Sequence, residues 1–291
     1  MTAKILDGKA VAAQIRSEVA ERVKALAPRG VTPGLTAVLV GDDEPSKIYV
    51  GGKQKASAEV GIHSERLDLP AEISQGELIE HIQVLNRDPA VHGILVQLPL
   101  PSHIDVTAVH EAVEPTKDVD GLTPVSVGRM VRGEPIFLPC TPLGIVELLV
   151  RSGIQIERAE VVIVGRGALV GMPLAIMLAQ KAPRANATVT LCHTGTRDLL
   201  IHTRRAEILV VAAGRPGTVT PDMVMPGATV VDVGVNRLPD GKLVGDVDFE
   251  PVSKVAGDIT PVPGGVGPMT IAMLLENTVT AAERSIEHHT T

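Results

Sequence analysis

Short apolar runs alternate with segments of helical periodicity along most of this 291-residue chain. One run, Leu-Thr-Ala-Val-Leu-Val at 35–40, lies between Gly34 and Gly41, and another, Val-Val-Ile-Val, occupies 161–164. Such runs are typical of strands that are buried on both faces of a parallel sheet. Because helical patterns separate the runs, the chain is predicted to be an α/β protein built from βαβ units.

The predicted elements divide the chain near residue 140. Strands are predicted at 35–40, 62–67, 93–97, 161–164, 188–192, 208–212 and 229–233. Helices are predicted at 11–26, 49–60 and 74–86, and after Thr141 and Gly171. Thr141 is expected to cap the helix that opens the second half, since Pro142 suits a first helical position. A second domain is therefore expected to begin there, and the chain is long enough for two.

The composition excludes several classes of function. Two phenylalanines, one tyrosine and no tryptophan leave an aliphatic core and little aromatic surface for stacking on nucleic acid. A net charge of −7 also argues against a protein that binds polyanions. No segment is apolar over the length of a membrane-spanning helix, and the N-terminus does not resemble a secretory leader. The protein is therefore expected in the cytoplasm, without nucleic-acid or membrane partners.

The cysteines and histidines show no metal-binding pattern. Cys140 and Cys192 are far apart in the chain and are expected to be reduced thiols. His288 and His289 are adjacent, but the end of a polar helix explains this pair without a ligand. No metal site is predicted.

Tyr49, the single tyrosine, precedes Lys53 by four positions. In a helix, both side chains lie on one face and can address the same small molecule. The alternative is a packed tyrosine beside a solvated lysine, because Lys47 and Lys55 give the segment an ordinary charged surface.

Two further polar positions follow predicted strands or turns. Gln97 ends a strand that Pro99 and Pro101 cannot continue, and ligands of open α/β sheets bind beyond such strand ends. The alternative is a glutamine that hydrogen-bonds the turn. Asp118 and Asp120 lie in a glycine-containing turn, where an aspartate that merely forms the turn is the alternative.

The strand at 161–164 runs directly into a glycine turn, 165–171, and then into an apolar helix. This order suits a dinucleotide phosphate, although the G-x-G-x-x-x-G spacing is one residue longer than usual and a plain tight turn is the alternative. The next strand ends without an acid that would grip the ribose of NAD. Arg166, Thr194 and Arg197 instead suit the extra phosphate of NADP.

Two loops in the last third of the chain are also informative. Residues 260–270 contain three glycines and three prolines, which indicates either a shaped ligand surface or a structural crossover. Residues 246–248, Asp-Val-Asp, are expected to form a surface turn.

Six segments carry a resemblance to one family, in a fixed order. They are Tyr49 to Lys53, Val96-Gln97-Leu98-Pro99-Leu100-Pro101, Lys117-Asp118-Val119-Asp120-Gly121, Pro139-Cys140-Thr141-Pro142, Val164-Gly165-Arg166, and Pro261-Val262-Pro263-Gly264-Gly265-Val266-Gly267-Pro268. Over essentially its whole length, the chain resembles the bifunctional methylenetetrahydrofolate dehydrogenase/methenyltetrahydrofolate cyclohydrolase family.

The resemblance implies an N-terminal three-layer α/β domain at 1–139 and an NADP-binding Rossmann-like domain with a parallel sheet at 140–267. The C-terminal helix, 268–287, is expected to pack back on the first domain. The implied reactions are oxidation of methylenetetrahydrofolate with NADP and hydrolysis of the methenyl product to the 10-formyl form. A homodimer is also implied.

By the same resemblance, Lys53 is the acid/base residue of hydrolysis, with Gln97 beside it, Tyr49 against the folate and Asp120 holding the pterin ring. The remaining residues implied to line the folate site are Val96, Leu98, Pro263, Gly264, Gly265, Val266 and Gly267. The residues implied to border the cofactor are Gly165, Arg166, Gly167, Thr194 and Val235.

Two substitutions and two rival classes bear on this interpretation. Gly167 and Thr194 replace serines that are common in the family, so one hydroxyl donor to the cofactor phosphate is missing. Short-chain dehydrogenases also use a tyrosine and a lysine four apart, but their glycine-rich loop precedes the pair, whereas here it follows. A dinucleotide-sensing regulatory module is the second rival, and the presence of Lys53, Gln97 and Asp120 argues against it.

Overall fold

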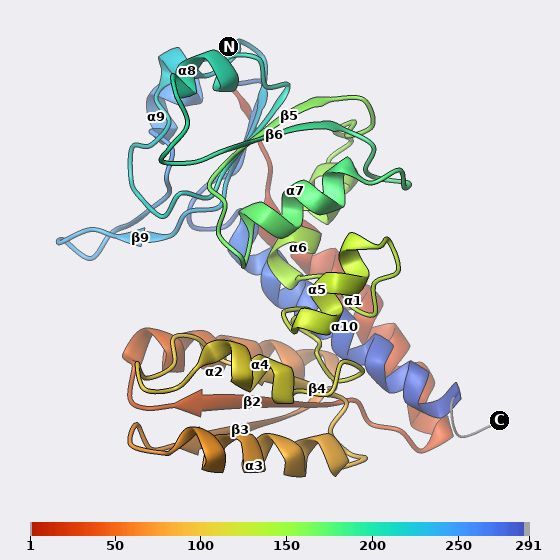
Figure 1. Cartoon of the computed structure of the whole chain (residues 1–291). Helices are drawn as coiled ribbons and strands as arrows, with labels where there is room; N and C mark the ends of the chain where they lie inside the picture. Colours follow the sequence, from red (N-terminus) through yellow and green to blue (C-terminus); the bar gives the residue numbers. More distant parts are fainter. Residues whose placement is uncertain (1, 288–291) are drawn as a thin grey trace. The chain divides into compact units, whose positions relative to one another are not determined.

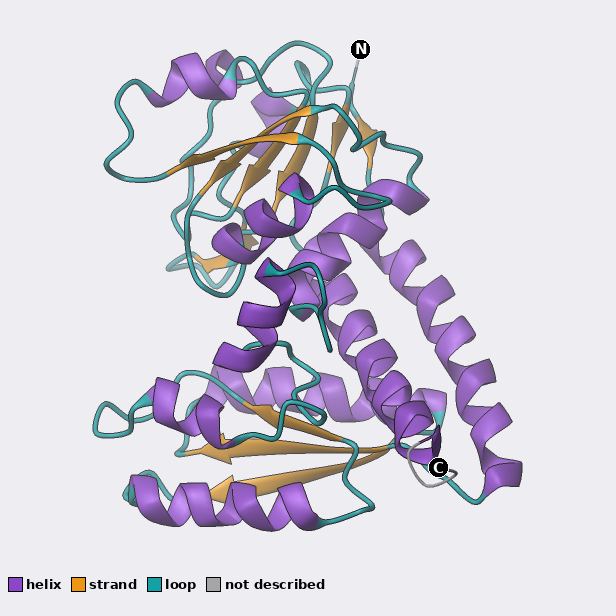
Figure 2. Cartoon of the chain, turned by 45° about the vertical axis from the view of Figure 1, so that its right-hand side comes forward, coloured by secondary structure: helices purple, strands orange, loops and turns teal. Residues whose placement is uncertain are grey.

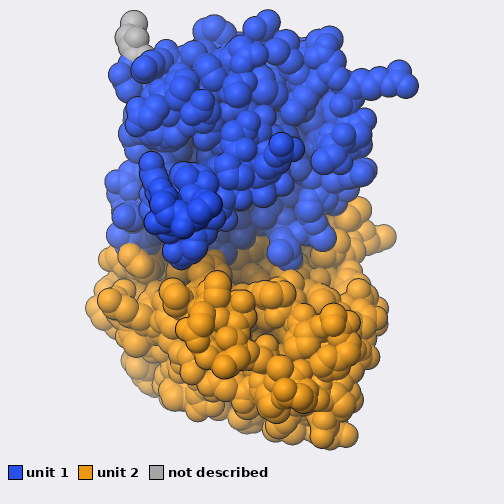
Figure 3. Space-filling view, turned by 90° about the vertical axis from the view of Figure 1, so that its left-hand side faces the viewer, with its two compact units in different colours: residues 1–13, 141–270 blue, residues 14–140, 271–291 orange. Residues whose placement is uncertain are grey.

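The computed structural model describes residues 2–287, so His288 and His289 lie outside the described residues. The chain forms two compact units, which Figure 3 colours separately. Unit 1 comprises residues 1–13 and 141–270, and unit 2 comprises residues 14–140 and 271–291. Helices α1 (Gly8–Leu26), α6 (Cys140–Arg151) and α10 (Val266–Glu287) each contribute residues to both units.

Unit 2 is built around a three-stranded parallel sheet with the strand order β3-β2-β4. Its strands are β2 (Gly34–Val40), β3 (His63–Leu69) and β4 (Gly93–Val96). Its other helices are the short η1 (Ala27–Arg29), α2 (Glu44–Val60), α3 (Gln75–Arg87), α4 (Val106–Ala112) and α5 (Pro124–Val131).

The two faces of this sheet bury alternate residues of the same strands. On one face, Val38 and Val96 pack with Leu78 of α3 and Val109 of α4 in a single core cluster. Helix α2 lies on the other side of the sheet from α3 (Figure 1). Unit 2 is therefore a three-layer α/β structure.

Unit 1 contains a six-stranded sheet with the order β1-β11-β8-β7-β5-β6, in which every neighbouring pair is parallel. Its strands are β1 (Lys4–Ile5), β5 (Glu160–Val164), β6 (Thr188–Cys192), β7 (Ile208–Val211), β8 (Thr229–Asp232) and β11 (Asp258–Ile259). Strands β9 (Asn236–Arg237) and β10 (Leu243–Val244) form a separate antiparallel hairpin. The other helices are α7 (Gly171–Ala179), α8 (Leu199–Thr203), η2 (Pro221–Met223) and α9 (Phe249–Val252).

Figure 2 distinguishes the helices, strands and loops of both units by colour. The predicted strands are confirmed to within two residues at their ends. Strands β1, β9, β10 and β11 were not predicted, because two residues each are too few to form a recognisable apolar run. Within the described residues, no helix is both long and apolar enough to cross a membrane.

The chain departs from the sequence-based boundaries at two places. Residues 1–13, expected in the N-terminal domain, group with unit 1 because β1 pairs with β11 at the edge of its sheet. Thr141 does not cap α6, because that helix already begins at Cys140. The Thr141 hydroxyl instead lies 3.0 Å from the hydroxyl of Thr270.

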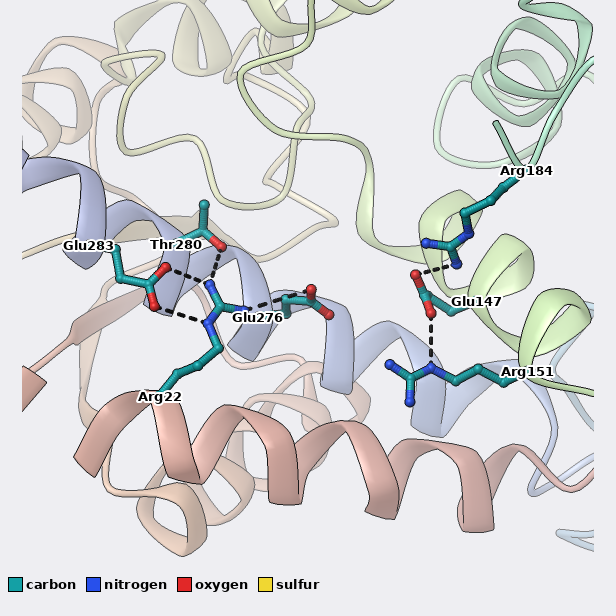
Figure 4. A network of polar contacts seen from close by, with 7 residues as sticks. All are labelled: Arg22, Glu147, Arg151, Arg184, Glu276, Thr280 and Glu283. Carbon is teal, nitrogen blue, oxygen red and sulfur yellow. Dashed lines mark hydrogen bonds and ion pairs between the residues drawn. The ribbon is translucent and has the colours of Figure 1, made fainter. Parts of the chain in front are cut away.

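Two partly buried ion-pair networks, one within each unit, fix helices in place (Figure 4). In unit 2, Arg22 of α1 forms a two-pronged pair with Glu283 of α10, with Nε–Oε1 at 3.0 Å and Nη2–Oε2 at 2.7 Å. In unit 1, Glu147 of α6 accepts hydrogen bonds from Arg151 and Arg184. The first pair holds the C-terminal helix on α1.

Candidate active site

Lys53 lies in the middle of α2, and capping residues determine where this helix begins and ends. The Asp43 carboxylate accepts a hydrogen bond from the backbone N–H of Ser46 at 2.9 Å, and Gly61 ends the helix with φ of 84°. The helix begins earlier than the predicted start at Tyr49. Tyr49 and Lys53 are therefore one helical turn apart on the same side.

Lys53 is a buried amine that is hydrogen-bonded to a neutral amide. Only 5% of the residue is exposed, whereas Tyr49 is 37% exposed. Lys53 Nζ donates to Gln97 Oε1 at 3.1 Å and lies 4.3 Å from the centre of the Tyr49 ring. The alternative of a core tyrosine beside a solvated lysine is therefore wrong.

Gln97 reaches Lys53 because of its place at the end of β4. Its backbone N–H still pairs with the Val38 carbonyl at 2.9 Å, so the strand alternation continues to this residue. Val96 packs on the α3 side of the sheet, and Gln97 consequently points to the α2 side. Gln97 Nε2 donates to the Leu98 carbonyl at 2.7 Å, which leaves its Oε1 for the lysine.

The two aspartates of the turn at 117–122 have different surroundings. Asp118 is buried, and its carboxylate accepts backbone hydrogen bonds that include one from Thr123 at 2.9 Å. Asp118 is therefore the residue that forms the turn. Asp120 and Lys53 instead influence each other, because the charge of each residue affects the pKa of the other.

The surroundings of Lys53 favour its neutral form. Burial lowers the pKa of Lys53 below the usual value for a lysine, and the nearby charge of Asp120 opposes part of this change. Burial likewise raises the pKa of Asp120, and the charge of Lys53 opposes that change. An amine whose pKa is lowered by burial can exchange protons closer to neutral pH.

Two side chains beside Asp120 were not predicted as site residues. The Cys140 thiol donates to the Val119 carbonyl at 3.3 Å, and burial raises its pKa well above the usual value. Asn277 Nδ2 donates to the same carbonyl at 2.8 Å. Asn277 lies on α10, 158 positions from Val119, so no local spacing in the sequence could reveal it.

The predicted glycine turn joins β5 to α7 in unit 1. Gly165 has φ of 118°, and a Cβ there would overlap the Ala212 carbonyl, while a Cβ on Gly171 would overlap the Gly165 carbonyl. A Cβ on Gly167 would meet no atom within 4 Å, so a serine would fit there. Helix α7 begins without a side-chain cap, and an uncapped start beside a glycine turn suits a phosphate.

The other predicted cofactor residues follow the carboxyl ends of neighbouring strands. Arg166 follows β5, Thr194 follows β6, and Val235, which is 63% exposed, follows β8. In the sheet, β6 and β7 flank β5, so the strand order reverses at the glycine turn. Ligands of doubly wound sheets bind outside the carboxyl ends of the strands at such a point.

The loop at 263–267 belongs to unit 1, and close backbone packing determines its shape. The backbone N–H of Lys9 donates to the Gly264 carbonyl at 3.1 Å, and Gly264 has φ of 114°. A Cβ on Gly265 would lie 2.7 Å from the Pro261 carbonyl oxygen. Gly264 and Gly265 are therefore required by the fold of the loop, and its role in folate binding stays a prediction.

The predicted site residues thus form two groups. Unit 2 brings Tyr49, Lys53, Gln97 and Asp120 together, and unit 1 places Gly165, Arg166, Thr194 and Val235 along one edge of its sheet. A doubly wound sheet with a glycine turn, joined to an α/β unit with a buried lysine, defines a dinucleotide-dependent enzyme of two domains.

Comparison with known proteins specifies the family. Residues 6–120 match the catalytic domain of tetrahydrofolate dehydrogenase/cyclohydrolase, and residues 139–286 match its NAD(P)-binding domain. The chain therefore belongs to the tetrahydrofolate dehydrogenase/cyclohydrolase family.

Three relatives illustrate the similarity. Bifunctional protein FolD of Bordetella avium (strain 197N) is 54% identical over 286 residues, 98% of this chain and 99% of that protein. The bifunctional FolD crystal structure from Campylobacter jejuni is 50% identical with a TM-score of 0.94, covering 97% and 99% of the two chains. The Trypanosoma brucei dehydrogenase-cyclohydrolase, solved with NADP and an inhibitor, is 42% identical with a TM-score of 0.92, covering 98% and 99%. The predicted family, α/β fold class and combined dehydrogenase and cyclohydrolase activity are confirmed.

Proposed function

We propose that this protein oxidises 5,10-methylenetetrahydrofolate with NADP and hydrolyses the 5,10-methenyltetrahydrofolate product to 10-formyltetrahydrofolate. One observation carries the assignment of the hydrolytic residues. The observation is that the buried Lys53 amine lies 3.1 Å from the neutral Gln97 amide and that the charge of Asp120 acts on its pKa. Hydride transfer needs no such group, whereas hydrolysis at neutral pH needs a proton acceptor with a lowered pKa.

In this proposal, Lys53 is the acid/base residue of hydrolysis. Water adds to the methenyl carbon, and the neutral amine accepts the proton that the water loses. The ammonium group then donates its proton to N5 as the bond between that carbon and N5 breaks, and the hydroxyl group on the carbon releases its proton to solvent, which leaves the formyl group on N10. Gln97 orients the amine without adding a charge that would hold the proton.

Tyr49 and Asp120 are assigned to folate binding. The partly exposed ring of Tyr49 offers a flat apolar surface, and the Asp120 carboxylate can accept hydrogen bonds from pterin N–H groups. Val96 and Leu98, on either side of Gln97 in the sequence, are assigned to the same folate site. Val96 is 7% exposed and can contribute to it through its backbone. The loop residues assigned to the same substrate are Pro263, Gly264, Gly265, Val266 and Gly267.

The carboxyl edge of the unit 1 sheet fits NADP. Gly165 lacks the Cβ that would block backbone approach to a pyrophosphate, and the exposed Arg166 can pair with the 2′-phosphate. Gly167, Thr194 and Val235 are assigned to the border of the same site. When bound, NADP accepts the hydride from the methylene carbon, and the residues of the chain contribute by aligning the two rings.

We also infer a homodimer in the cytoplasm. Cys140 and Cys192 are free and buried, which fits a reducing compartment. Light scattering after size-exclusion chromatography should give twice the 30.5 kDa mass of one chain. The mass of a single chain would contradict the dimer.

The dehydrogenase is tested by mixing the protein with 5,10-methylenetetrahydrofolate and either NADP or NAD, while the absorbance of the reduced cofactor is recorded. Reduction of NADP in preference to NAD is expected. If the absorbance changes with neither cofactor, the dehydrogenase assignment is wrong.

Hydrolysis is tested separately, through the loss of methenyltetrahydrofolate absorbance. Lys53→Met should abolish it, since methionine has similar length but cannot carry a proton. The matched control is Lys55→Met, because Lys55 is exposed on the same helix and should be dispensable. Full hydrolytic activity of Lys53→Met would overturn the role of Lys53.

A further inference from the structure

Two aspartates at the carboxyl edge of the unit 1 sheet are buried. Asp246 is fully buried and Asp232 is 2% exposed. The expectation of a surface turn at 246–248 is therefore wrong for Asp246. Because a buried carboxylate is costly unless hydrogen bonds satisfy it, the donors around these two side chains indicate their role.

Asp232, the last residue of β8, binds the chain as it leaves the sheet and again as it returns. Its Oδ1 accepts hydrogen bonds from the backbone N–H groups of Gly234 at 3.2 Å and Asp246 at 2.8 Å. Its Oδ2 accepts one from the N–H of Val247 at 3.0 Å. The segment between these two points contains Val235 and the β9–β10 hairpin.

Asp246 connects the hairpin to the neighbouring strand β7. Its Oδ2 accepts hydrogen bonds from the N–H groups of Ala213 at 2.7 Å and Gly214 at 2.8 Å, which follow β7. Its Oδ1 accepts one from Asn236 Nδ2 at 2.8 Å, at the start of β9. Backbone N–H groups and one amide thus satisfy both carboxylates.

Two glycines bring the backbone directly against these carboxylates. A Cβ on Gly234 would overlap the Asp246 carboxylate, and a Cβ on Gly245 would overlap that of Asp232. The backbone after β7 also meets the glycine turn, because a Cβ on Gly165 would lie 3.3 Å from the backbone nitrogen of Ala213. The aspartates therefore set the positions of segments that border both Gly165 and Val235.

We propose that Asp232 and Asp246 are positioning residues for the nicotinamide cofactor, which fix the backbone at 212–214 and 233–235 in the form that binds it. The proposal rests on the proposed NADP site. Neither carboxylate contacts the cofactor. Each acts through the backbone that it holds, around Gly165 and Val235.

The test compares Asp232→Asn and Asp246→Asn with the unsubstituted protein. Each asparagine places an NH₂ group where a carboxylate oxygen accepts a hydrogen bond, so at least one contact is lost. The KM for NADP should rise roughly tenfold. Hydrolysis of methenyltetrahydrofolate, which uses no cofactor, should stay within about twofold, as should the dehydrogenase kcat at saturating NADP.

Asp248→Asn is the matched control, because Asp248 is an exposed aspartate of the same segment and should tolerate the same substitution. A parallel loss of both activities in both variants would show that the pair only stabilises the fold, and would overturn the inference. So would an unchanged KM for NADP in both. If one variant fails to fold, the other decides. Absence of NADP reduction by the unsubstituted protein would instead contradict the proposed function.

Discussion

Replacement of Gln97 by glutamate tests most directly why a neutral partner accompanies Lys53. The two side chains have nearly the same shape, so a carboxylate oxygen would take the place of the amide oxygen, 3.1 Å from Lys53 Nζ. At an effective dielectric constant of about 20, two unit charges at that distance attract by about 5 kcal/mol. Desolvation of the new carboxylate offsets part of this energy, and roughly half remains as stabilisation of the ammonium form.

About 3 kcal/mol changes the ratio of ammonium to amine by roughly a hundredfold. The rate of hydrolysis at neutral pH should therefore fall about a hundredfold in Gln97→Glu. The lost rate should return as the pH is raised, because the carboxylate raises the pKa of Lys53. The assay is the loss of methenyltetrahydrofolate absorbance, recorded from about pH 6 to about pH 10.

Gln97→Leu separates the effect of charge from the loss of the amide. This variant loses the hydrogen bond that orients Lys53 but gains no charge, so its rate should fall without a shift of the pH profile to higher pH. If Gln97→Glu keeps the pH profile of the unsubstituted protein, the reasoning about a neutral partner is refuted.

Three further predictions concern stability and ligand binding. Arg22→Met removes the pair with Glu283 and should lower the free energy of unfolding by about 2 kcal/mol; an unchanged urea midpoint would contradict this account of how α10 is held. Burial raises the pKa of Asp232 to about 6. Because the folded protein binds this proton more tightly than the unfolded chain, Asp232 should remove roughly 3 kcal/mol of stability as the pH rises from about 4 through 6, and the comparison with Asp232→Asn in urea titrations isolates that contribution. Tyr49 is the only tyrosine in a chain without tryptophan, so its fluorescence should change on folate binding; no change at saturation would remove it from the site.

The strands were predictable because their apolar residues are contiguous in the chain. Both faces of a strand in a parallel sheet are covered, so consecutive residues of the runs at 35–40 and 161–164 are mostly apolar. This pattern can be read from neighbouring positions in the sequence. Strand β1 has no such signal: only two residues pair with β11, which is more than 250 positions away in sequence. The assignment of residues 1–13 to unit 1 therefore depends on a long-range pairing that no local pattern contains.

Residue type and spacing identified Lys53, Gln97 and Asp120 as candidates but did not determine their environments. Asp118 and Asp120 are equivalent in a turn pattern, yet backbone N–H groups satisfy Asp118, while the charge of Asp120 acts on Lys53. Residues 246–248 were predicted to form a surface turn, and acidic residues are indeed usually exposed. Asp246 is buried because the chain passes over it from two strand ends.

The sequence by itself determined the α/β class, the order of the motifs and the chemical groups available to each reaction, because these follow from residue type and local periodicity. The tertiary structure decided which of those groups are buried and which charges they face. Lys53 has a lowered pKa because the fold removes it from water beside Gln97, and Asn277 reaches the chain next to Asp120 from α10. Desolvation and charge act through space. The lowered pKa of Lys53, the neighbour of Tyr49, therefore arises only when distant parts of the chain come together.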